Sequence, residues 1–358
     1  MTTSEIRYGV IGTGMMGVEH INNIRAVDGA VLTAVADPHE ASLADARQAA
    51  DDQALPSFSD HRALIDADLC DAIVVATPNM THVDVLLDLM KTGLHVLVEK
   101  PLCTTVEDCL RVMTADEGRD AITWVGLEYR YMPAISRLVD LVDDGTIGDL
   151  KMLAIREHRF PFLEKVNDWN RMSANTGGTL VEKCCHYFDL MNRIIGQRPA
   201  RIYASGGQDV NHLDELYDGE PSDILDNAYV TIDYEGGARA MLDLCMFAEG
   251  GRNQEEVVAV GNLGKVEAFN PSSEVAIGRR DSSWFSPDIE VATDERIAYT
   301  GHHHGASYVE HLEFLNAIRT GSSPAVTLAD GMLAVAMGVA AHRSIDEARP
   351  VLLDEVIG

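Results

Sequence analysis

Cysteine is scarce in this chain of 358 residues, which contains only six. No two of them form a Cys-x-x-Cys pair, so we expect neither a disulfide scaffold nor a structural zinc site. Long apolar runs are scarce too: the longest late stretch, 332–341, is about half of a membrane span. The opening residues, 1–9, lack the apolar core of a signal peptide. These absences predict a protein of the reducing cytoplasm.

Basic residues are few, with 28 Lys and Arg against 57 Asp and Glu and a net charge of −29. A protein that binds duplex DNA or RNA needs a basic footprint, so no nucleic-acid partner is expected. The same charge repels an anionic membrane surface, so no membrane partner is expected either. A small anionic ligand is compatible with it, because a few local cations override the overall charge. The composition, 46% apolar and 24% charged residues, is that of a folded protein. The length of 358 residues predicts two or three domains.

The first third of the chain alternates short apolar runs with helical patterns. Strands that alternate with helices predict a parallel sheet with right-handed crossovers. The expected strands lie at 6–11, 31–36, 73–76, 94–99 and 122–126. The expected helices lie at 16–27, 40–50, 82–92 and shortly after residue 104. Residues 1–126 are therefore predicted to form a doubly wound parallel sheet of the Rossmann type.

The pattern changes near residue 126, where longer strands follow one another. Glycine turns at 235–237 and 261–264 separate some of them, which is typical of an antiparallel or mixed open sheet. The expected strands lie at 150–157, 200–205, 227–234, 238–246, 255–260 and 265–269, and the expected helices at 134–143, 178–195, 307–319 and 329–348. The chain is thus predicted to be an α/β protein. Residues 127–358 form its second, substrate-binding α/β domain, with a large, open, mostly antiparallel sheet.

One segment of the second half is strongly acidic. Between 208 and 226 there are seven acidic residues and neither lysine nor arginine. A run of like charge is most often a solvated loop, so we expect one here. A contact with another subunit is the alternative.

The first expected strand leads into a glycine-rich turn, Gly12-Thr13-Gly14-Met15-Met16-Gly17. In such a turn the first glycine permits the tight bend, the second admits a pyrophosphate, and the third lets helix and strand pack closely. Asp37 closes the second strand, where its carboxylate can accept hydrogen bonds from a ribose diol. Its charge repels a 2′-phosphate, and no arginine stands directly after it. The sequence therefore predicts NAD rather than NADP as the cofactor. A plain glycine turn with a surface aspartate is the alternative.

Two further loops follow strands of the predicted parallel sheet. Thr77-Pro78-Asn79 follows the third strand, and Glu99-Lys100-Pro101 follows the fourth. Ligands of doubly wound sheets bind at the carboxyl ends of the strands, where both loops must lie. The ammonium of Lys100 can bind a substrate hydroxyl there and stabilise developing alkoxide charge. The alternative for Lys100 is an exposed cation paired with Glu99.

Taken together, these motifs resemble the glucose–fructose oxidoreductase, inositol dehydrogenase and rhizopine catabolism (Gfo/Idh/MocA) family. The resemblance covers essentially the whole chain. It also rests on His82 and on Gly177-Gly178-Thr179-Leu180, which leads to His186 and Asp189. It implies an NAD(P)-dependent oxidoreductase of sugars, polyols and their derivatives. It further implies a homodimer or homotetramer, because the open sheet of such proteins usually makes the subunit contact.

The resemblance also assigns residues. It implies that the family's lysine corresponds to Lys100 and that its helical Asp-x-x-x-His pair corresponds to Glu182 and His186. Glutamate in place of aspartate is a departure, because one extra methylene moves the carboxylate. The expected coenzyme contacts beyond the glycine turn and Asp37 are Thr77, Pro78, Asn79, His82, Glu99 and Lys100.

The histidine pair can also be argued from its spacing. Glu182 and His186 are four residues apart in a predicted helix and share one face, which Asp189 extends by a turn. A carboxylate can orient a histidine ring and support its charged form, which suits acid and base catalysis. We therefore expect His186 to accept the proton in alcohol oxidation and Lys100 to polarise the same oxygen, or the reverse. An ion pair on the helix surface is the alternative.

Cations and hydrogen-bond donors gather in the segment before this helix. Arginine forks bind carboxylate, phosphate or sulfonate oxygens, so the segment suggests an anionic sugar such as a uronic acid or a sulfo-sugar. The residues concerned are Arg156, His158, Arg159, Trp169, Asn170 and Arg171, together with Lys183 in the helix. Tyr129 and Tyr131 are further candidates for the pocket, with core packing as their alternative. The alternative for the cations is pairing with Glu157, Glu164 and Asp168.

Three adjacent histidines, 302–304, cannot all point one way in a strand or a helix, so no metal site is predicted. The role that we consider for them is one ring reaching the substrate pocket.

Three functions fit the sequence. The first is an NAD-dependent dehydrogenase that transfers a hydride between a hydroxyl of a sugar, polyol or sugar acid and nicotinamide. The second is a redox-cycling glycosidase, in which oxidation, elimination, hydration and re-reduction cleave an anionic glycoside such as a sulfoquinovoside or glucuronide. The third is a non-catalytic NAD-binding regulator, which the presence of both Lys100 and His186 disfavours.

Overall fold

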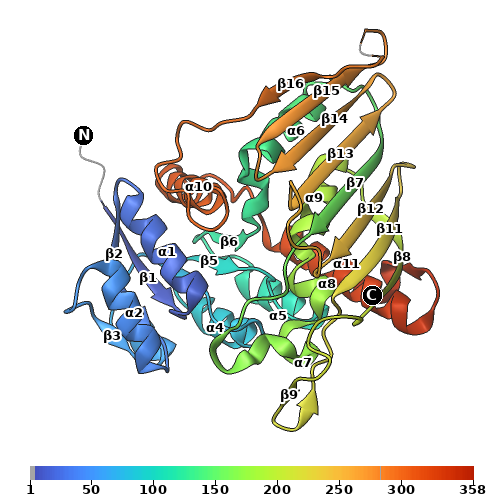
Figure 1. The fold of residues 1–358 in the computed structure, drawn as a ribbon. Coiled ribbons are helices and arrows are strands. Elements are labelled where there is room, and N and C mark those ends of the chain that lie inside the picture. The colour runs from blue at the N-terminus through green and yellow to red at the C-terminus, as the bar shows by residue number, and fades with distance from the viewer. Residues whose placement is uncertain (1–4, 283) are drawn as a thin grey trace. The chain divides into compact units, whose positions relative to one another are not determined.

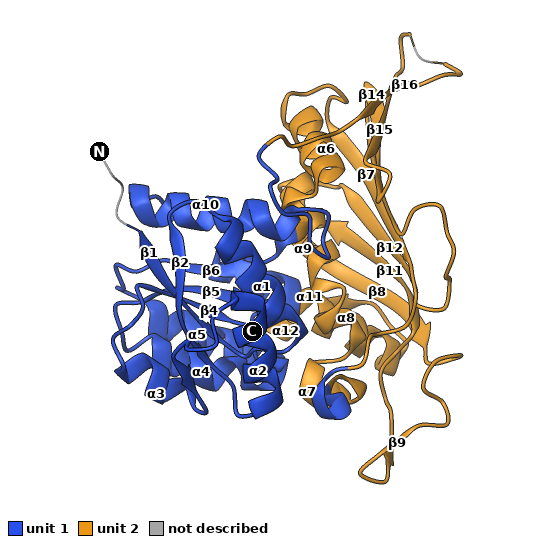
Figure 2. Ribbon diagram, turned by 60° about the vertical axis from the view of Figure 1, so that its left-hand side comes forward, with its two compact units in different colours: residues 1–128, 165–169, 296–335 blue, residues 129–164, 170–295, 336–358 orange. Residues whose placement is uncertain are grey.

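The computed structural model describes residues 5–282 and 284–358. The described chain forms two compact units, shown in separate colours in Figure 2. The first unit contains the described residues up to Glu128 together with 165–169 and 296–335. The second contains the described residues of 129–164, 170–295 and 336–358. The first unit therefore includes a late segment of the chain that the sequence pattern places in the substrate domain.

A parallel sheet of six strands forms the centre of the first unit (Figure 1). Its order is β3-β2-β1-β4-β5-β6, and all neighbours are parallel. The strands are β1 (Ile6–Ile11), β2 (Ala30–Ala36), β3 (Ser57–Phe58), β4 (Ala72–Val75), β5 (His95–Glu99) and β6 (Thr123–Gly126). Starting from β1, the chain builds the sheet first toward one edge and then toward the other, which confirms the predicted doubly wound fold. Every side chain of β4 is buried, as expected for a strand covered on both faces.

Helices connect these strands, and one late helix joins them. They are α1 (Met15–Ala26), α2 (Glu40–Ala50), α3 (His61–Asp66), α4 (His82–Leu89), α5 (Val106–Asp116) and α10 (Ala306–Thr320). The late helix α10 packs on α1, where the rings of His20 and His311 lie 5.1 Å apart. The elements β3 and α3 were not predicted, because two and six residues are too few for a periodic pattern.

A mixed sheet of nine strands forms the centre of the second unit, in the order β16-β15-β14-β13-β7-β12-β11-β8-β17. Among the described strands of this sheet, β7 and β12 are the one parallel pair of neighbours. The strands are β7 (Leu150–His158), β8 (Pro199–Gly207), β11 (Asn227–Tyr234), β12 (Arg239–Cys245), β13 (Glu255–Gly261), β14 (Gly264–Asn270), β15 (Glu274–Arg279), β16 (Asp288–Val291) and β17 (Val351–Leu352). This arrangement confirms the predicted large and mostly antiparallel sheet.

Burial alternates along the central strands of this sheet. In β11 the side chains of Ala228 and Val230 are buried, while Tyr229 between them is 63% exposed. The same alternation in β8 leaves Tyr203 exposed. One face of the sheet therefore belongs to the core, and the other presents apolar side chains at the surface of the chain.

The helix predicted at 178–195 is two helices. The backbone N–H of Cys184 reaches back five residues to the carbonyl oxygen of Thr179, which loosens the turn. The N–H of Tyr187 then bonds only three residues back, to Cys184, and the second helix continues from this tighter turn. The helices of the second unit are α6 (Pro133–Asp143), α7 (Ser173–Thr176), α8 (Thr179–Glu182), α9 (Cys185–Ile195), α11 (Leu328–Glu347, whose first turns belong to the first unit) and α12 (Asp354–Ile357).

The acidic segment 208–226 forms a loop with one small hairpin of strands β9 (Leu216–Tyr217) and β10 (Glu220–Pro221). Most of its acidic side chains are exposed, in agreement with the predicted solvated loop. Asp226 is the exception, because its buried carboxylate accepts the backbone N–H groups of Val210 and Asn211, both at 2.7 Å. Burial alone would raise the pKa of Asp226, but these donors lower it.

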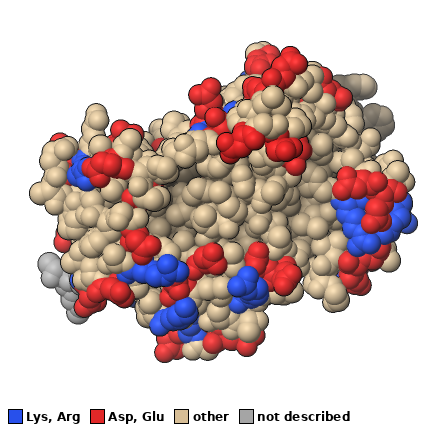
Figure 3. All heavy atoms as spheres, turned by 90° about the horizontal axis from the view of Figure 1, so that it is seen from below, with Lys and Arg blue, Asp and Glu red and all other residues tan. Residues whose placement is uncertain are grey.

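The acidic excess of the sequence is visible at the surface. On the face drawn in Figure 3, carboxylates lie in several separate groups and the basic side chains lie beside them. Within the described part of the chain, no helix is both long and apolar enough to cross a membrane.

Candidate active site

The glycine turn after β1 has the geometry that its sequence predicts. Gly12 has a φ of +87°, and a Cβ placed on it would lie 2.6 Å from the backbone of Ala76 and Thr77. A Cβ on Gly17 would lie 2.0 Å from the carbonyl oxygen of Gly12. A Cβ on Gly14, by contrast, would meet nothing within 4 Å. The fold therefore requires the first and last glycines, whereas the middle one leaves open space at the start of α1.

Asp37 lies beside this turn at the end of β2, where two backbone donors hold it. Its Oδ2 accepts the N–H of Thr13 at 2.8 Å, and its Oδ1 accepts the N–H of His39 at 2.8 Å. The hydroxyl of Thr13 and the Nδ2 of Asn79 are buried and have no hydrogen-bond partner in the described part of the chain. Buried polar atoms without partners are uncommon in proteins, so these two mark a place for a polar ligand. The residues present thus fit a dinucleotide at the carboxyl edge of the sheet.

His82 connects the two loops that are predicted to contact the coenzyme. Its Nδ1 lies 2.9 Å from the carbonyl oxygen of Pro101, and its Nε2 lies 2.9 Å from that of Thr77. Burial lowers the pKa of His82, and a neutral ring donates to one of these oxygens at a time. The ring thereby ties the loop after β4 to the loop after β5.

Glu99, at the end of β5, is held by a chain of buried histidines. Its Oε1 lies 2.9 Å from Nε2 of His20, and Nδ1 of His20 lies 2.9 Å from Nε2 of His311. Burial alone would raise the pKa of Glu99, but the hydrogen bond from His20 brings it to about 2. The other oxygen, Oε2, accepts the backbone N–H of Lys100 at 3.1 Å. The charged carboxylate thus fixes the backbone from which the lysine side chain starts.

In the second unit, two glycines prepare the helix that carries the predicted histidine. Gly177 and Gly178 have φ values of +82° and +84°, and a Cβ on Gly178 would lie 2.4 Å from Nε2 of His342. Glu182 then ends α8, and His186 lies in the first turn of α9, both of them buried. The prediction of one continuous helix for both residues is therefore wrong, since the break at 183–184 separates α8 from α9.

His186 lies against an aromatic ring. The rings of Tyr129 and His186 stack with their centroids 3.9 Å apart and 6° between their planes. The Nζ of Lys183 donates to the hydroxyl oxygen of Tyr129 at 2.8 Å. The same Nζ lies 3.0 Å from Oε1 of Glu157. The structure thus brings together three predicted pocket residues, Tyr129, Lys183 and His186, next to a buried carboxylate.

Asp189 lies nearly one turn further along α9 than His186. It accepts from the guanidinium of Arg130, whose Nε lies 2.6 Å from its Oδ2. The carboxylate therefore belongs to a two-point ion pair with an arginine of the segment that also holds Tyr129 and Tyr131.

Comparison with known proteins identifies the family. The family model described as "Oxidoreductase family, NAD-binding Rossmann fold" matches residues 6–127, and the one described as "Oxidoreductase family, C-terminal alpha/beta domain" matches residues 139–353. The chain belongs to the Gfo/Idh/MocA oxidoreductase family. This confirms the resemblance drawn from the motifs, and it confirms NAD as the coenzyme of the first unit.

Relatives of this oxidoreductase match it along its length. It is similar to the myo-inositol 2-dehydrogenase of Thermotoga maritima, at 29% identity over 99% of this chain and 100% of that protein. Inositol 2-dehydrogenase 2 of Saccharopolyspora erythraea is 31% identical over 74% of each chain. Among solved structures, a probable dehydrogenase from Thermotoga maritima covers 98% of this chain and 100% of its own at 26% identity, with a TM-score of 0.80.

Some cations suggested for an anionic substrate lie elsewhere in this oxidoreductase. Arg156 and His158 project from the face of β7 opposite Glu157, because side chains alternate along a strand. Arg156 pairs there with Glu256, and Nε2 of His158 lies 3.1 Å from Oδ1 of Asp243. Both side chains therefore have carboxylate partners, but these are Glu256 and Asp243 rather than the Glu157, Glu164 and Asp168 that the sequence suggested.

The remaining suggested donors are divided between two places. Arg159 faces the buried cluster, with Nη1 3.5 Å from Oε1 of Glu157. Arg171 donates to the carbonyl oxygen of Phe162 at 3.3 Å. Asn170 donates to the carbonyl oxygen of Leu163 at 3.1 Å. Trp169 belongs to the first unit, whereas these other residues belong to the second. Arg159 is therefore the suggested arginine that shares a carboxylate with Lys183.

Two buried glutamates of this cluster were missed as site residues. Glu157 continues the buried positions Leu153 and Ile155 of β7, and Glu255 precedes the buried Val257 of β13. An acid at an inward position of an alternating strand is the signal that would have found both. Neither glutamate belongs to a recognised short motif.

The three adjacent histidines have separate surroundings in the first unit. The backbone N–H of His302 donates to Oε1 of Glu19 at 3.1 Å. Nδ1 of His303 lies 3.4 Å from Oε1 of Glu128. Burial lowers the pKa of His304. No cluster of three metal-ligating side chains exists among the residues that the structure describes.

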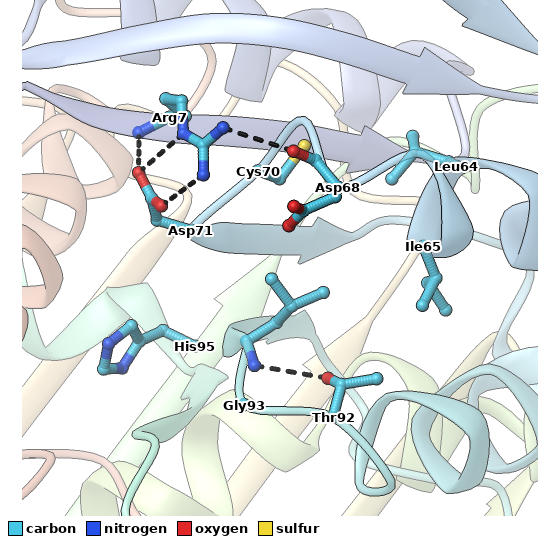
Figure 4. A pocket seen from close by; sticks show the side chains of 10 residues that line it. Arg7, Leu64, Ile65, Asp68, Cys70, Asp71, Thr92, Gly93 and His95 are labelled. Atoms are coloured by element: carbon cyan, nitrogen blue, oxygen red, sulfur yellow. Dashed lines mark hydrogen bonds and ion pairs between the residues drawn. The ribbon is translucent and has the colours of Figure 1, made fainter.

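A separate cavity of about 440 Å³ lies where the strands of the parallel sheet begin, at the edge opposite the coenzyme loops (Figure 4). It is lined where strands begin, by Arg7 of β1, by Asp71 just before β4 and by His95 of β5. The guanidinium of Arg7 is bound by Asp71 through Nη2 at 2.8 Å and Nε at 3.2 Å. Because the coenzyme loops follow the ends of the strands, this cavity is not the coenzyme site.

Proposed function

We propose that this oxidoreductase is an NAD-dependent dehydrogenase that acts on a hydroxyl group of a sugar or polyol. Two relatives that match most of the chain are named inositol 2-dehydrogenases, and inositol is a polyol. The observation in this chain that carries the proposal is His186, which is only 2% exposed and stacks on a tyrosine bound by an ammonium. A buried imidazole among polar side chains is suited to take a proton from a hydroxyl group.

The coenzyme end supplies binding and orientation. The turn at 12–17 offers backbone N–H groups to the pyrophosphate at the start of α1, and Asp37 accepts hydrogen bonds from the ribose. The segment 77–79, with His82, Glu99 and Lys100, lines the rest of the coenzyme site in this proposal. When bound, the coenzyme supplies the acceptor for the hydride.

Acid–base chemistry falls to side chains of both units. In our proposal His186 accepts the proton of the substrate hydroxyl, and Lys100 polarises the oxygen of that hydroxyl; the reverse assignment is the alternative. Glu182, at the family's carboxylate position, supports the charged form of the imidazole. Tyr129, Tyr131, Arg159, Trp169, Arg171 and Lys183 are the proposed substrate contacts.

We infer an uncharged substrate rather than an anionic sugar. Lys183 and Arg159 both face Glu157, which is fully buried. An anionic substrate would have to draw these cations away from a carboxylate that cannot reach water, which is strongly unfavourable. Substrate hydroxyls can instead share hydrogen bonds with Lys183 and Tyr129 without breaking that pair.

The test is a panel of inositols, aldoses, sugar acids and aryl glycosides, each incubated with the enzyme and NAD. NADH absorbance and aglycone release are followed together. The proposal predicts NADH in proportion to the ketone formed with at least one uncharged sugar or polyol, and a sugar acid as the best substrate would contradict the inferred charge. Aglycone release with no net NADH would show the redox-cycling glycosidase instead. Coenzyme binding without turnover of any compound would show the regulator.

A further inference from the structure

Two buried glutamates oppose each other on neighbouring strands of the nine-stranded sheet. Glu157 of β7 pairs in register with Glu255 of β13. Their side chains are 0% and 3% exposed. Residues directly opposite each other on antiparallel strands have Cβ atoms roughly 5 Å apart. Two carboxylates so close together and away from water strongly resist being ionised at the same time.

Glu255 is the member of the pair that holds a proton near neutral pH. Burial, and after it the charge of Glu157, raise the pKa of Glu255 to about 7. Its Oε1 accepts from Nε2 of Gln254 at 2.5 Å, and its Oε2 has no hydrogen-bond partner among the described residues. Nζ of Lys183 and Nη1 of Arg159 lie 3.0 Å and 3.5 Å from Oε1 of Glu157. The pair therefore carries one negative charge and one exchangeable proton.

Lys183 links this pair to the proposed catalytic histidine. Its Nζ lies 3.0 Å from Oε1 of Glu157 and donates to the hydroxyl of Tyr129 at 2.8 Å. The ring of Tyr129 in turn stacks on His186. A continuous series of polar contacts thus leads from the buried carboxylates to a hydroxyl group beside the imidazole.

Other ionisable groups that face this series are not exchangeable near neutral pH. Burial raises the pKa of the Cys184 thiol and that of the Tyr187 hydroxyl well above their usual values. The guanidinium of Arg159 stays charged, as arginine does in proteins. Within the described cluster, the groups that can transfer protons are therefore the two glutamates, Lys183, Tyr129 and His186.

We propose that Glu157 and Glu255 form a buried proton store that exchanges one proton with the substrate through Lys183 and the hydroxyl of Tyr129. Tyr129 is then a second acid–base group of the site, besides His186. The inference rests on the proposed function, because it requires a substrate hydroxyl bound next to this tyrosine.

The transfers balance without any further reactant. During oxidation the ammonium of Lys183 gives one of its protons to an oxygen of Glu157, which leaves a lone pair on Nζ. The hydroxyl proton of Tyr129 passes to this lone pair as the substrate's hydroxyl proton passes to the oxygen of Tyr129, so tyrosine and lysine end in the forms in which they began. The glutamate pair gains one proton, and the electron pair leaves the substrate carbon as the hydride that NAD accepts. Reduction reverses each transfer.

The pH profile of kcat tests the store. The store accepts a proton readily once Glu255 is ionised, so wild-type oxidation should rise through a pH near 7 and then level off. Glu255→Gln should lose this rise. Tyr129→Phe keeps the ring that stacks on His186 but removes the hydroxyl, and should lower kcat about 10²-fold, with a smaller change in KM from the lost substrate hydrogen bond. Lys183→Arg should retain more of the activity than Lys183→Met.

Glu256→Gln is the matched control for Glu255→Gln. Glu256 is the next residue of β13, projects from the opposite face and pairs with Arg156. Its substitution should leave the pH profile as in the wild type. Wild-type pH dependence in both Glu255→Gln and Tyr129→Phe would overturn the proposal.

Infrared difference spectra recorded across this pH range give a readout that needs no turnover. The store predicts a protonated carboxyl band in the wild type that disappears with rising pH and is absent in Glu255→Gln. Should that variant not fold, Glu157→Gln should move the titration of the band to lower pH, because a like charge is removed. Absence of the band in the wild type would overturn the store. If no compound of the panel is oxidised, the proposed function fails, and the band still decides whether the store exists.

Discussion

The two units build their polar sites from different parts of the chain. The first relies on backbone: Gly12 shapes a tight turn, and the N–H of Thr13 holds the carboxylate of Asp37. The second relies on side chains that are far apart in sequence, from Tyr129 to Glu255. A backbone site should therefore fail when a Cβ intrudes, and a side-chain site should fail when a titratable group is removed.

Among substitutions in the first unit, the largest effect on turnover is expected at its lysine. Lys100→Met removes an ammonium proposed to polarise the substrate oxygen and should lower turnover by about 10²–10³-fold. Coenzyme affinity should change much less, because the turn at 12–17 is intact. Steady-state kinetics and a coenzyme titration check this, with Lys100→Arg as the control that keeps the charge. Turnover of Lys100→Met equal to that of the wild type would remove Lys100 from the mechanism.

The glycine turn offers a matched pair of substitutions. Gly12→Ala places a Cβ 2.6 Å from backbone atoms at a positive φ and should lower the free energy of unfolding by roughly 2–4 kcal/mol. Gly14→Ala has free space in the folded chain and should keep its stability while binding NAD more weakly. Denaturant unfolding and a coenzyme titration on both variants measure the difference. Equal stability losses would contradict the account of the turn.

The buried acid should make stability depend on pH. The folded protein keeps a proton on Glu255 up to about pH 7, whereas an ordinary glutamate has released it above 4.5. Its contribution to stability is present below that lower value and is lost as pH rises through the folded pKa. Relative to Glu255→Gln, the wild type should therefore lose roughly 3 kcal/mol across this window. Urea unfolding at several pH values tests the prediction, and a constant difference between the two proteins would refute it.

The smallest effect is expected at the ribose. Asp37→Ala removes a charged acceptor, and hydrogen bonds to charged groups contribute about 1.5–3 kcal/mol. NAD should therefore bind about tenfold to 10²-fold more weakly, and NADP, freed from repulsion, should lose less or gain. Titrations with both coenzymes give the ratio. An unchanged preference for NAD would mean that another residue sets it.

The first unit could be predicted almost completely from the sequence. Its apolar runs, the turn at 12–17 and Asp37 follow one another within a short stretch, and local pattern determines local structure there. What the sequence did not reveal is that the helix predicted at 307–319, α10, belongs to this unit, where its His311 contacts His20, which in turn contacts Glu99. A contact between residues so far apart leaves no periodic signal.

The second unit was predicted in outline and not in detail. The strands and the residues Tyr129, Lys183 and His186 were identified, but the spacing argument for Glu182 assumed a continuous helix. The loosened turn at 183–184 arises because the backbone N–H of Cys184 bonds to the carbonyl oxygen of Thr179. The choice of this acceptor cannot be read from the amino-acid sequence. Glu157 and Glu255 lie opposite each other because of the register between β7 and β13. These strands are not joined by a hairpin turn, so the sequence does not specify their register.

The most direct measurement compares coenzyme binding and NADH formation in His186→Ala, using the best substrate of the panel. Because the proposal assigns coenzyme binding to the first unit and His186 belongs to the second, the variant should have the same NAD dissociation constant as the wild type. The proposal also predicts a loss of turnover of about 10²–10⁴-fold. Wild-type turnover in this variant, or turnover and NAD affinity lost together, would contradict it.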